Sequence, residues 1–200
     1  MAEEALIELI IHGREERNLE YKGSLSWKYN TTRAEAAKTC MGMANIPDGG
    51  AIVFGVKEMS RNQYEPIGMK SSHFESFNQD DVSDYVNGYA DPYVELKVSK
   101  VPHDGKKFVI IQVQEFSELP VICKKNGPEG LKKGAIFTRP RRKNETVAVP
   151  SQTEMREILD SAVDKRVRKN REQLFRWGLI RPAAPEDIDV QKFEEQLRNL

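Results

Sequence analysis

The sequence predicts an α+β fold, in which a mixed β-sheet is packed by helices and followed by a C-terminal helical extension. Three observations lead to this prediction: helical and strand-like periodicities are interleaved, hairpin-type turns join the strand-like segments, and charged residues dominate the last part of the chain. Two hundred residues suffice for one sizeable domain and an appendage. We place the domain at residues 4–165, and a basic helix, a linker and a short helical piece at residues 166–200.

The first quarter of the chain alternates between helical and extended segments. Residues 2–12 predict a short helix, because apolar side chains recur on one face at helical spacing. Residues 18–25, NLEYKGSL, are expected to be extended. Residues 33–45 predict a helix whose narrow apolar face carries small side chains, which permit close packing on a sheet. Residues 51–56, AIVFGV, form a continuous apolar run that is typical of a buried central strand.

A hairpin dominates the middle of the chain. Residues 80–88 predict a short helix with apolar side chains on its inner face. Residues 93–101 then alternate strictly between apolar and polar side chains, as a half-buried strand does. Residues 108–116 are the expected partner strand, because Asp104-Gly105 between the two segments is a strong hairpin-turn signal.

The last predicted elements are two short strands and a long helix. The strands are expected at residues 119–123 and 135–139, with a basic, glycine-containing loop between them. Ser151 and Glu154 have the spacing of a capping box, which predicts the start of a helix. The apolar face of that helix becomes irregular after Val167, where charged side chains take over.

Charge and cysteine usage set limits on partners and compartment. The total charge says nothing, because 31 basic residues balance 31 acidic ones. The bases are grouped, with eight bases and one acid in residues 124–143 and seven bases and two acids in residues 161–181. Such runs favour basic surfaces, although each run alone is more often a solvated face. Cys40 and Cys123 lack a CxxC spacing, so we expect free thiols in a reducing compartment.

Several classes of protein are disfavoured. No apolar run is long enough to span a membrane, and the N-terminus carries acids where a signal peptide would carry bases, so we expect a cytoplasmic protein without a membrane partner. The phosphate-loop pattern GxxxxGK[ST] is absent, so no nucleotide cofactor is expected. Exposed amides at Gly49-Gly50 could hold an anion, but a structural turn is the favoured interpretation.

The order of these segments resembles that of the Schlafen-like Alba domain family over roughly residues 10–160. The resemblance rests on GREERNLEYKGSL, then AEAAKTCMGMANIPDGGAIVFGVKE, then PIGM, FVIIQVQEFSELPVICKK and GAIFTRPRRKNETVAVPSQTEMREIL. Any one segment would be weak, whereas five in the right order are specific. The positions that match the family pattern are Gly13, Glu15, Glu20-Tyr21-Lys22, Met43-Ala44-Asn45, Gly49-Gly50, Gly55-Val56, Arg139 and Thr146.

The resemblance implies a compact module that binds DNA or RNA. The Schlafen ribonucleases depend on three acidic residues, and the matching positions here are Glu15, Glu20 and Glu58. These would be the catalytic residues of a divalent-metal-dependent endoribonuclease, with Mg²⁺ or Mn²⁺ held by the three carboxylates. The chain departs from the family at Lys57-Glu58, where an Asp usually follows Gly-Val. That departure puts the activity in doubt and leaves the fold expectation intact.

Lys22 has two interpretations. Side chains alternate along a strand, so Glu20 and Lys22 share one face, and Lys22 could stabilise a phosphate beside the metal as a further catalytic residue. The same pair is also what a charged strand surface shows, in which case it contributes at most ~1 kcal/mol. Binding without cleavage is therefore the first hypothesis, and metal-dependent cleavage is the alternative.

The basic segment after the 135–139 strand supplies the candidate phosphate contacts. Arg139 and Arg141 would point to the same side if that strand continued. A solubilising sheet edge is the other interpretation. The expected nucleic-acid-binding residues are Lys132, Lys133, Arg139, Arg141, Arg142 and Lys143. A third hypothesis is a protein-interaction or dimerisation module, with an apolar helix face or an exposed strand as its interface, and a homodimer is one such assembly.

Overall fold

The computed structural model describes residues 3–180. The chain divides into two units, Met1–Ala162 and Val163–Leu200, and each is described by itself. The predicted boundary lay after residue 165. The predicted linker at 181–187 and the short helical piece after it lie outside the described residues.

The described residues form helices and mostly short strands. The helices are α1 (Glu3–Ile11), α2 (Asn30–Ala44), α3 (Ser71–Glu75), α4 (Gln79–Asn87) and α5 (Gln152–Arg176). The strands are β1 (Leu19–Lys22), β2 (Gly50–Phe54), β3 (Val56–Ser60), β4 (Gln63–Pro66), β5 (Ala90–Asp91), β6 (Leu96–His103), β7 (Lys106–Val113), β8 (Ile122–Cys123), β9 (Phe137–Thr138) and β10 (Val147–Ala148). This arrangement confirms the predicted α+β class.

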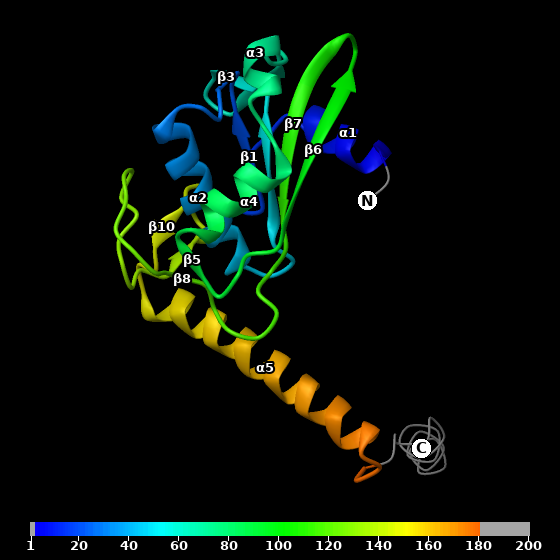
Figure 1. The fold of residues 1–200 in the computed structure, drawn as a ribbon, viewed down its shortest axis with the longest axis vertical. Coiled ribbons are helices and arrows are strands. Elements are labelled where there is room, and N and C mark those ends of the chain that lie inside the picture. Colours follow the sequence, from blue (N-terminus) through cyan, green and yellow to red (C-terminus); the bar gives the residue numbers. More distant parts are fainter. Residues whose placement is uncertain (1–2, 181–200) are drawn as a thin grey trace, which may run out of the picture. The chain divides into compact units, whose positions relative to one another are not determined.

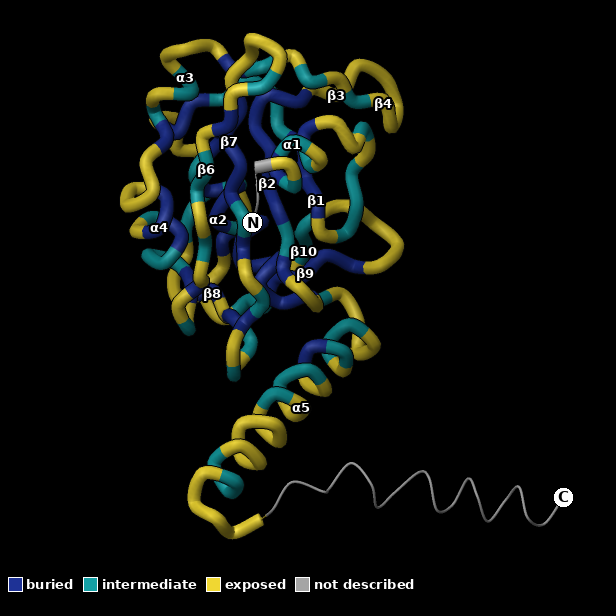
Figure 2. The backbone as a smooth tube through the Cα atoms, turned by 90° about the vertical axis from the view of Figure 1, so that its right-hand side faces the viewer, coloured by how far each residue is buried: buried dark blue, intermediate teal, exposed yellow. Residues whose placement is uncertain are grey.

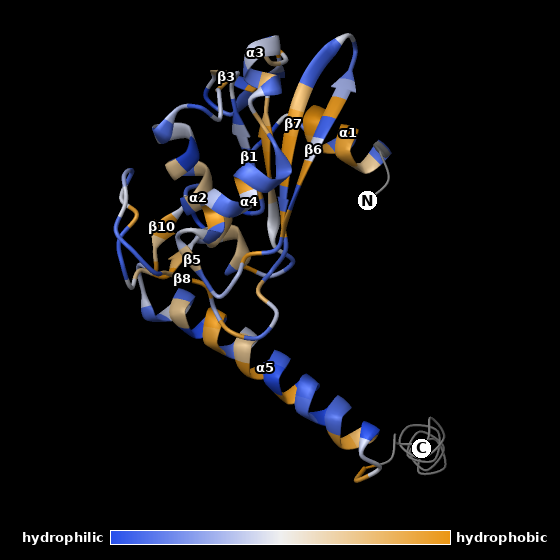
Figure 3. Ribbon diagram, viewed as in Figure 1, coloured by the Kyte–Doolittle hydropathy of each residue, from blue (hydrophilic) through white to orange (hydrophobic). Residues whose placement is uncertain are grey.

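A four-stranded mixed sheet in the order β1-β2-β7-β6 forms the centre of the first unit. β1 runs parallel to β2, whereas β2–β7 and β7–β6 are antiparallel. Figure 1 shows α2 and α4 on one side of this sheet and α1 on the other. The two central strands carry runs of buried apolar residues, as Figures 2 and 3 show for β7.

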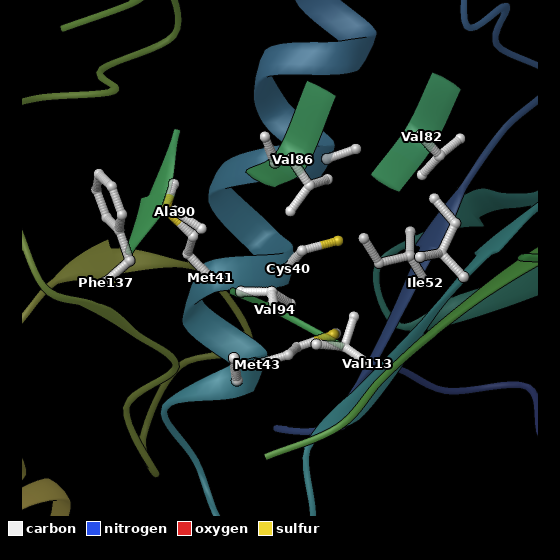
Figure 4. Packing of buried hydrophobic residues seen from close by; sticks show 14 of the residues in the cluster. Cys40, Met41, Met43, Ile52, Val82, Val86, Ala90, Val94, Val113 and Phe137 are labelled. Atoms are coloured by element: carbon white, nitrogen blue, oxygen red, sulfur yellow. The ribbon is translucent and has the colours of Figure 1, made fainter. Parts of the chain in front are cut away.

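Alternation along β2 divides the core into two clusters. Ile52 and Phe54 face α2 and pack with Cys40, Met41 and other small or flexible side chains. Figure 4 shows Cys40 and Met43 of α2 on the side of Ile52 and Val113 of the sheet, and Met41 beside Ala90. The predicted small-residue face is thus what lets α2 lie close to the sheet. Burial raises the pKa of the Cys40 thiol, so this cysteine is a packing residue.

The opposite face of the sheet is covered by α1. Leu6 and Ile10 of this helix pack on Tyr21 of β1 and on Val53 of β2. The Tyr21 hydroxyl donates a hydrogen bond of 2.8 Å to the carbonyl of Leu9, and burial raises its pKa to about 12. β1 is therefore held between two layers, with its odd-numbered side chains on the α1 side.

Two predicted strands end earlier than expected. The run at 51–56 breaks at Gly55, whose φ of 105° interrupts the strand, and Val56 begins the β3–β4 hairpin, which the sequence does not predict. A Cβ at Gly55 would lie 2.8 Å from the Phe108 ring, so glycine is required there. β9 ends at Thr138, and therefore Arg139 and Arg141 do not continue one strand face.

The last helix is longer than its apolar pattern. α5 begins after Ser151, whose Oγ accepts a hydrogen bond of 3.5 Å from the backbone N–H of Glu154 and donates one to its carboxylate. Charged side chains in the second half do not prevent helix formation, because Lys, Arg, Glu and Gln are good helix formers. No helix between residues 3 and 180 is both long enough and apolar enough to cross a bilayer.

Candidate functional site

The acidic and basic pair on β1 lies on the α2 face of the sheet. Leu19 and Tyr21 point to α1, so Glu20 and Lys22 point the other way, as the strand period predicts. Lys22 Nζ lies 2.9 Å from Glu20 Oε1, which confirms that the two side chains share a face. Glu20 is buried, with 7% of its surface exposed. The pair is therefore not a solvated surface ion pair.

Both carboxylate oxygens of Glu20 have partners. Oε1 pairs with Lys22, and Oε2 forms an ion pair with Nη1 of Arg139. The Thr39 hydroxyl of α2 donates to Oε2 at 3.3 Å. A buried carboxylate is stable only when its charge is compensated, and here one guanidinium, one ammonium and one hydroxyl supply that compensation.

Arg139 is the second half of this cluster. Its side chain is fully buried, and it reaches Glu20 across a sequence separation of 119 residues. Nε donates to the carbonyl of Arg17 at 2.6 Å, and Nη2 donates to the carbonyls of Glu16 at 3.2 Å and Asn144 at 3.0 Å. Arg139 was predicted to contact phosphate at the surface, but the structure places it in the interior with its donors in use.

Glu15 and Lys22 line a pocket of about 390 Å³ that also includes the exposed edge of Glu20, and we call it the glutamate pocket. Five carboxylates and two ammonium groups line it, so it carries a net negative charge. Burial raises the pKa of Glu15, and the neighbouring Glu20 charge adds to this, while the Tyr21 N–H, which donates to Glu15 at 2.9 Å, lowers it. Burial lowers the pKa of Lys22, but the charges and hydrogen bonds of Glu20 and Glu35 together outweigh this effect, so the net shift of the pKa is upward.

Glu58 lies outside this pocket. It is exposed on β3, opposite Tyr64 of β4, and accepts a hydrogen bond of 3.2 Å from the backbone N–H of Asn62. Tyr64 lies between the two sites: burial raises its pKa to about 12, with the charges of Glu15 and Glu58 contributing. The structure thus brings Glu15, Glu20 and Lys22 together and leaves Glu58 on the neighbouring hairpin.

The three predicted ligands do not fit a divalent cation. A metal site needs carboxylate oxygens that converge within about 2.0–2.6 Å of the ion. The oxygens of Glu20 are already paired with Arg139 and Lys22, and Glu58 is not among the residues that line the pocket. Among residues 3–180, no group of three or more His, Cys, Asp or Glu side chains could hold a metal ion.

The remaining predicted phosphate contacts lie on the surface. Lys132 and Lys133 are exposed on the loop before β9. Arg142 is exposed as well, whereas Arg141 pairs with Glu157 of α5 at 3.4 Å. Lys143 forms an exposed pair with Glu145 at 3.2 Å. The basic run therefore consists of exposed lysines before β9 and, after it, arginines of which some pair with glutamates.

Glu157 joins α5 to the segment before β1. Arg17 Nη1 and Nη2 lie 2.7 and 3.2 Å from its two oxygens, in a fork geometry. Hydrogen bonding from Arg17 lowers the pKa of Glu157, and Arg141 lowers it further. A lowered folded-state pKa means that the pair stabilises the fold above the ordinary carboxyl pKa of about 4.3 and loses this contribution as the pH falls through the folded-state pKa.

This linkage yields a prediction for Glu157→Gln. The variant should unfold at lower urea than the wild type at pH 7, and the gap should narrow steadily below about pH 4, where the wild-type carboxylate is protonated. Urea unfolding followed by circular dichroism at several pH values measures this gap. A gap that stays constant from pH 7 to pH 3 would show that the ion pair is not its source.

Comparison with known proteins places this sequence in a family. The family model described as Schlafen, AlbA_2 matches residues 15–148. The chain belongs to the Schlafen, AlbA_2 family. The uncharacterized ATP-binding protein UU034 of Ureaplasma parvum is 29% identical over 180 residues, which are 83% of this chain and 47% of that protein. The chain thus spans about half the length of this curated relative.

Two solved structures resemble this member of the Schlafen, AlbA_2 family. The DIP2311 protein of Corynebacterium diphtheriae matches 76% of this chain and 27% of its own, at 16% identity and a TM-score of 0.50. The N-terminal domain of an ATP-dependent DNA helicase RecG-related protein of Nitrosomonas europaea matches 66% of this chain and 88% of its own, at 18% identity and a TM-score of 0.43. At such identities the first likeness shows the fold alone.

Asn45 and Thr146, two residues of the family pattern, have structural roles that the sequence does not reveal. Asn45 is buried at the end of α2, where its amide donates to the carbonyls of Val121 and Phe137 at 2.8 and 2.9 Å and accepts from the N–H of Val121 at 2.7 Å. Thr146 Oγ1 accepts from Arg139 at 3.5 Å. Much of the family pattern in this chain thus holds segments together.

The Gly49-Gly50 turn has a structural role. A Cβ at Gly49, where φ is 71°, would lie 2.1 Å from the carbonyl of Val113, and one at Gly50 would lie 2.6 Å from that of Asn18. The N–H of Gly49 donates within the turn, to the carbonyl of Ile46 at 3.2 Å. The glycines therefore permit close backbone packing at the start of β2.

Proposed function

We propose that this domain binds nucleic acid through the segment of residues 124–133, which we call the lysine loop, and that it does so without cutting it. The observation that carries the proposal is the set of exposed lysines on this loop: Lys124, Lys125, Lys132 and Lys133. None of them pairs with a carboxylate among the described residues. The phosphates of a nucleic acid carry the negative charge that could pair with these lysines.

The lysine loop is held in one conformation by its backbone. The N–H of Gly127 donates to the carbonyl of Leu131 at 2.8 Å, and Leu131 itself is buried. The N–H of Lys133 donates to the side chain of Asn126 at 2.9 Å. A loop that is already ordered loses little entropy when a phosphate backbone binds, so its lysines are well suited to contact it.

The chemistry of the glutamate pocket supports binding over cleavage. Its net negative charge repels a phosphodiester unless a metal intervenes, and the three family acids do not converge as ligands. ATP binding, which the name of the Ureaplasma relative carries, forms no part of the proposal, because the glycine turn of this chain is used for packing.

Salt dependence of binding tests the proposal. We expect fluorescence anisotropy to show binding of labelled single-stranded RNA or DNA at low salt, with affinity falling as salt rises by a log–log slope of about −0.7 per neutralised phosphate. Changing the four lysines of the lysine loop to alanine should weaken binding about tenfold or more and reduce the slope by up to about 3.

A matched control distinguishes the effect of the lysine loop on binding from the effect of the net charge of the protein. Alanine substitutions at four lysines of the β6–β7 hairpin remove the same net charge elsewhere; these are Lys97, Lys100, Lys106 and Lys107. The hairpin variant should keep most of its affinity, since its four lysines lie outside the lysine loop. Equal losses in the two variants, or an unchanged loop variant, would overturn the proposal.

A further inference from the structure

A second pocket lies between the start of α2 and α4, away from the glutamate pocket. Its volume is about 550 Å³, and it contains aromatic, cationic and anionic side chains together. Its aromatic wall consists of Trp27, which is buried, and Tyr85, whose ring lies 6.0 Å from it in an edge-on arrangement. We call it the Arg33 pocket, after the side chain on which the argument rests.

Arg33 is half-buried, and one N–H of its guanidinium group lacks a hydrogen-bond partner. Its guanidinium carbon lies 4.9 Å from the centre of the Tyr85 ring, so one face of the group stacks on an aromatic surface. Its Nε is buried and has no hydrogen-bond acceptor within the part of the chain that the structure describes. Buried N–H donors are nearly always satisfied in native proteins, so a ligand that reaches this group when the Arg33 side chain shifts would supply the missing acceptor.

Cationic and anionic side chains both line the pocket, and they do not form ion pairs with one another. Lys28 and Arg33 contribute the cations, and Asp81 and Asp84 contribute the carboxylates. None of these four forms an ion pair within residues 3–180. The pocket therefore suits a flat ligand that offers hydrogen-bond acceptors on one edge and donors on another.

Guanine has this combination of groups. Its N7 and O6 accept hydrogen bonds from an arginine fork, while its N1–H and N2–H₂ groups donate to a carboxylate. Its ring can stack on an aromatic side chain or on a guanidinium plane, which is how proteins hold unpaired bases. A purely phosphate-binding site would not place Asp81 and Asp84 beside the arginine.

We propose that the Arg33 pocket holds an unpaired guanine of a single-stranded nucleic acid, with Arg33 donating to N7 and O6 and with Asp81 or Asp84 accepting from N1–H and N2–H₂. This inference rests on the proposed function. The pocket is connected to the lysine loop, because the rings of Tyr85 and Tyr89 lie 5.4 Å apart and Lys125 Nζ lies 4.5 Å over Tyr89. A strand bound on the loop can thus place a base in the pocket.

Base substitution in a short oligonucleotide tests the proposal. Anisotropy is measured for labelled 12-nucleotide adenine tracts with and without one central guanine, and with 7-deazaguanine at that position. The wild type should bind the guanine oligonucleotide about tenfold more tightly than the adenine tract, since one bidentate contact discriminates by that order. The 7-deaza substitution, which removes N7, should abolish most of the gain.

Arg33→Lys and Asp81→Asn with Asp84→Asn are the diagnostic variants. Each should bind the plain adenine tract within about twofold of the wild type and lose the guanine preference, with thermal unfolding followed to verify the fold. As a direct readout, 5′-GMP but not 5′-AMP should quench Trp27 fluorescence in a Trp177→Phe background, which leaves Trp27 as the single tryptophan.

The outcomes separate the two proposals. Guanine preference that disappears in the pocket variants supports the inference. Equal binding of all oligonucleotides by the wild type overturns the Arg33 pocket while nucleic-acid binding stands. Preference retained in the Arg33 variant also overturns it. Absence of binding to every oligonucleotide at low salt overturns both proposals.

Discussion

Replacing Arg139 with methionine should destabilise the fold by about 3–5 kcal/mol, because the change leaves the buried Glu20 carboxylate without its main counter-charge. The guanidinium also satisfies the carbonyls of Glu16, Arg17 and Asn144, which lose their donor in the variant. A loss of this size is a large part of the stability of a typical domain. Equilibrium urea unfolding measures it.

A control and a double variant assign the effect to the Glu20 ion pair. Arg142→Met removes the same charge three residues further along, at an exposed position, and should change stability by less than about 0.5 kcal/mol. Adding Glu20→Leu to Arg139→Met should cost much less than the sum of the single changes, because each change removes the partner that the other leaves unpaired. Strict additivity would contradict the account of the ion pair.

Replacing Asn45 with alanine should cost about 3 kcal/mol or more. The amide is buried and makes three hydrogen bonds that join the end of α2 to the strands around Val121 and Phe137. Removing it leaves two carbonyls and one N–H without a partner, at about 1–3 kcal/mol for each buried group that stays unsatisfied. The same urea titration measures the difference.

Asn30→Ala is the matched control for Asn45. It changes the same residue type at the first position of α2, where the side chain is exposed and accepts a single hydrogen bond of 3.1 Å from Tyr85. We expect a loss below about 1 kcal/mol. Equal unfolding midpoints for the two alanine variants would mean that water can replace the contacts of Asn45, contrary to its burial.

Local patterns predicted most of the helices and the main hairpin. The strand period placed Glu20 and Lys22 on one face, and Asp104-Gly105, both with positive φ, forms the turn that its sequence predicts. The β3–β4 hairpin was missed because the apolar run at 51–56 has the pattern of one strand, and the close approach of Phe108 that requires Gly55 to break that strand depends on a distant segment. Packing between distant segments is not visible in a local window.

The same limitation explains the misplacement of Arg139. In sequence it stands in a basic run, and such runs are usually solvated. Its burial depends on Glu20, 119 residues away, and on three carbonyls that the fold brings around it. The family pattern contains both Glu20 and Arg139, and in this chain the two residues form a buried ion pair.

The central claim is that this domain binds nucleic acid without metal-dependent cleavage, and a cleavage assay at Glu58 tests it most directly. Glu58→Gln is suitable because the residue is exposed, so the change should leave the fold intact. We predict that labelled single-stranded RNA, incubated with Mn²⁺ and the wild-type protein, is bound and stays intact, and that Glu58→Gln behaves identically. Products that appear only with Mn²⁺ and disappear in Glu58→Gln, at unchanged RNA affinity, would contradict the account.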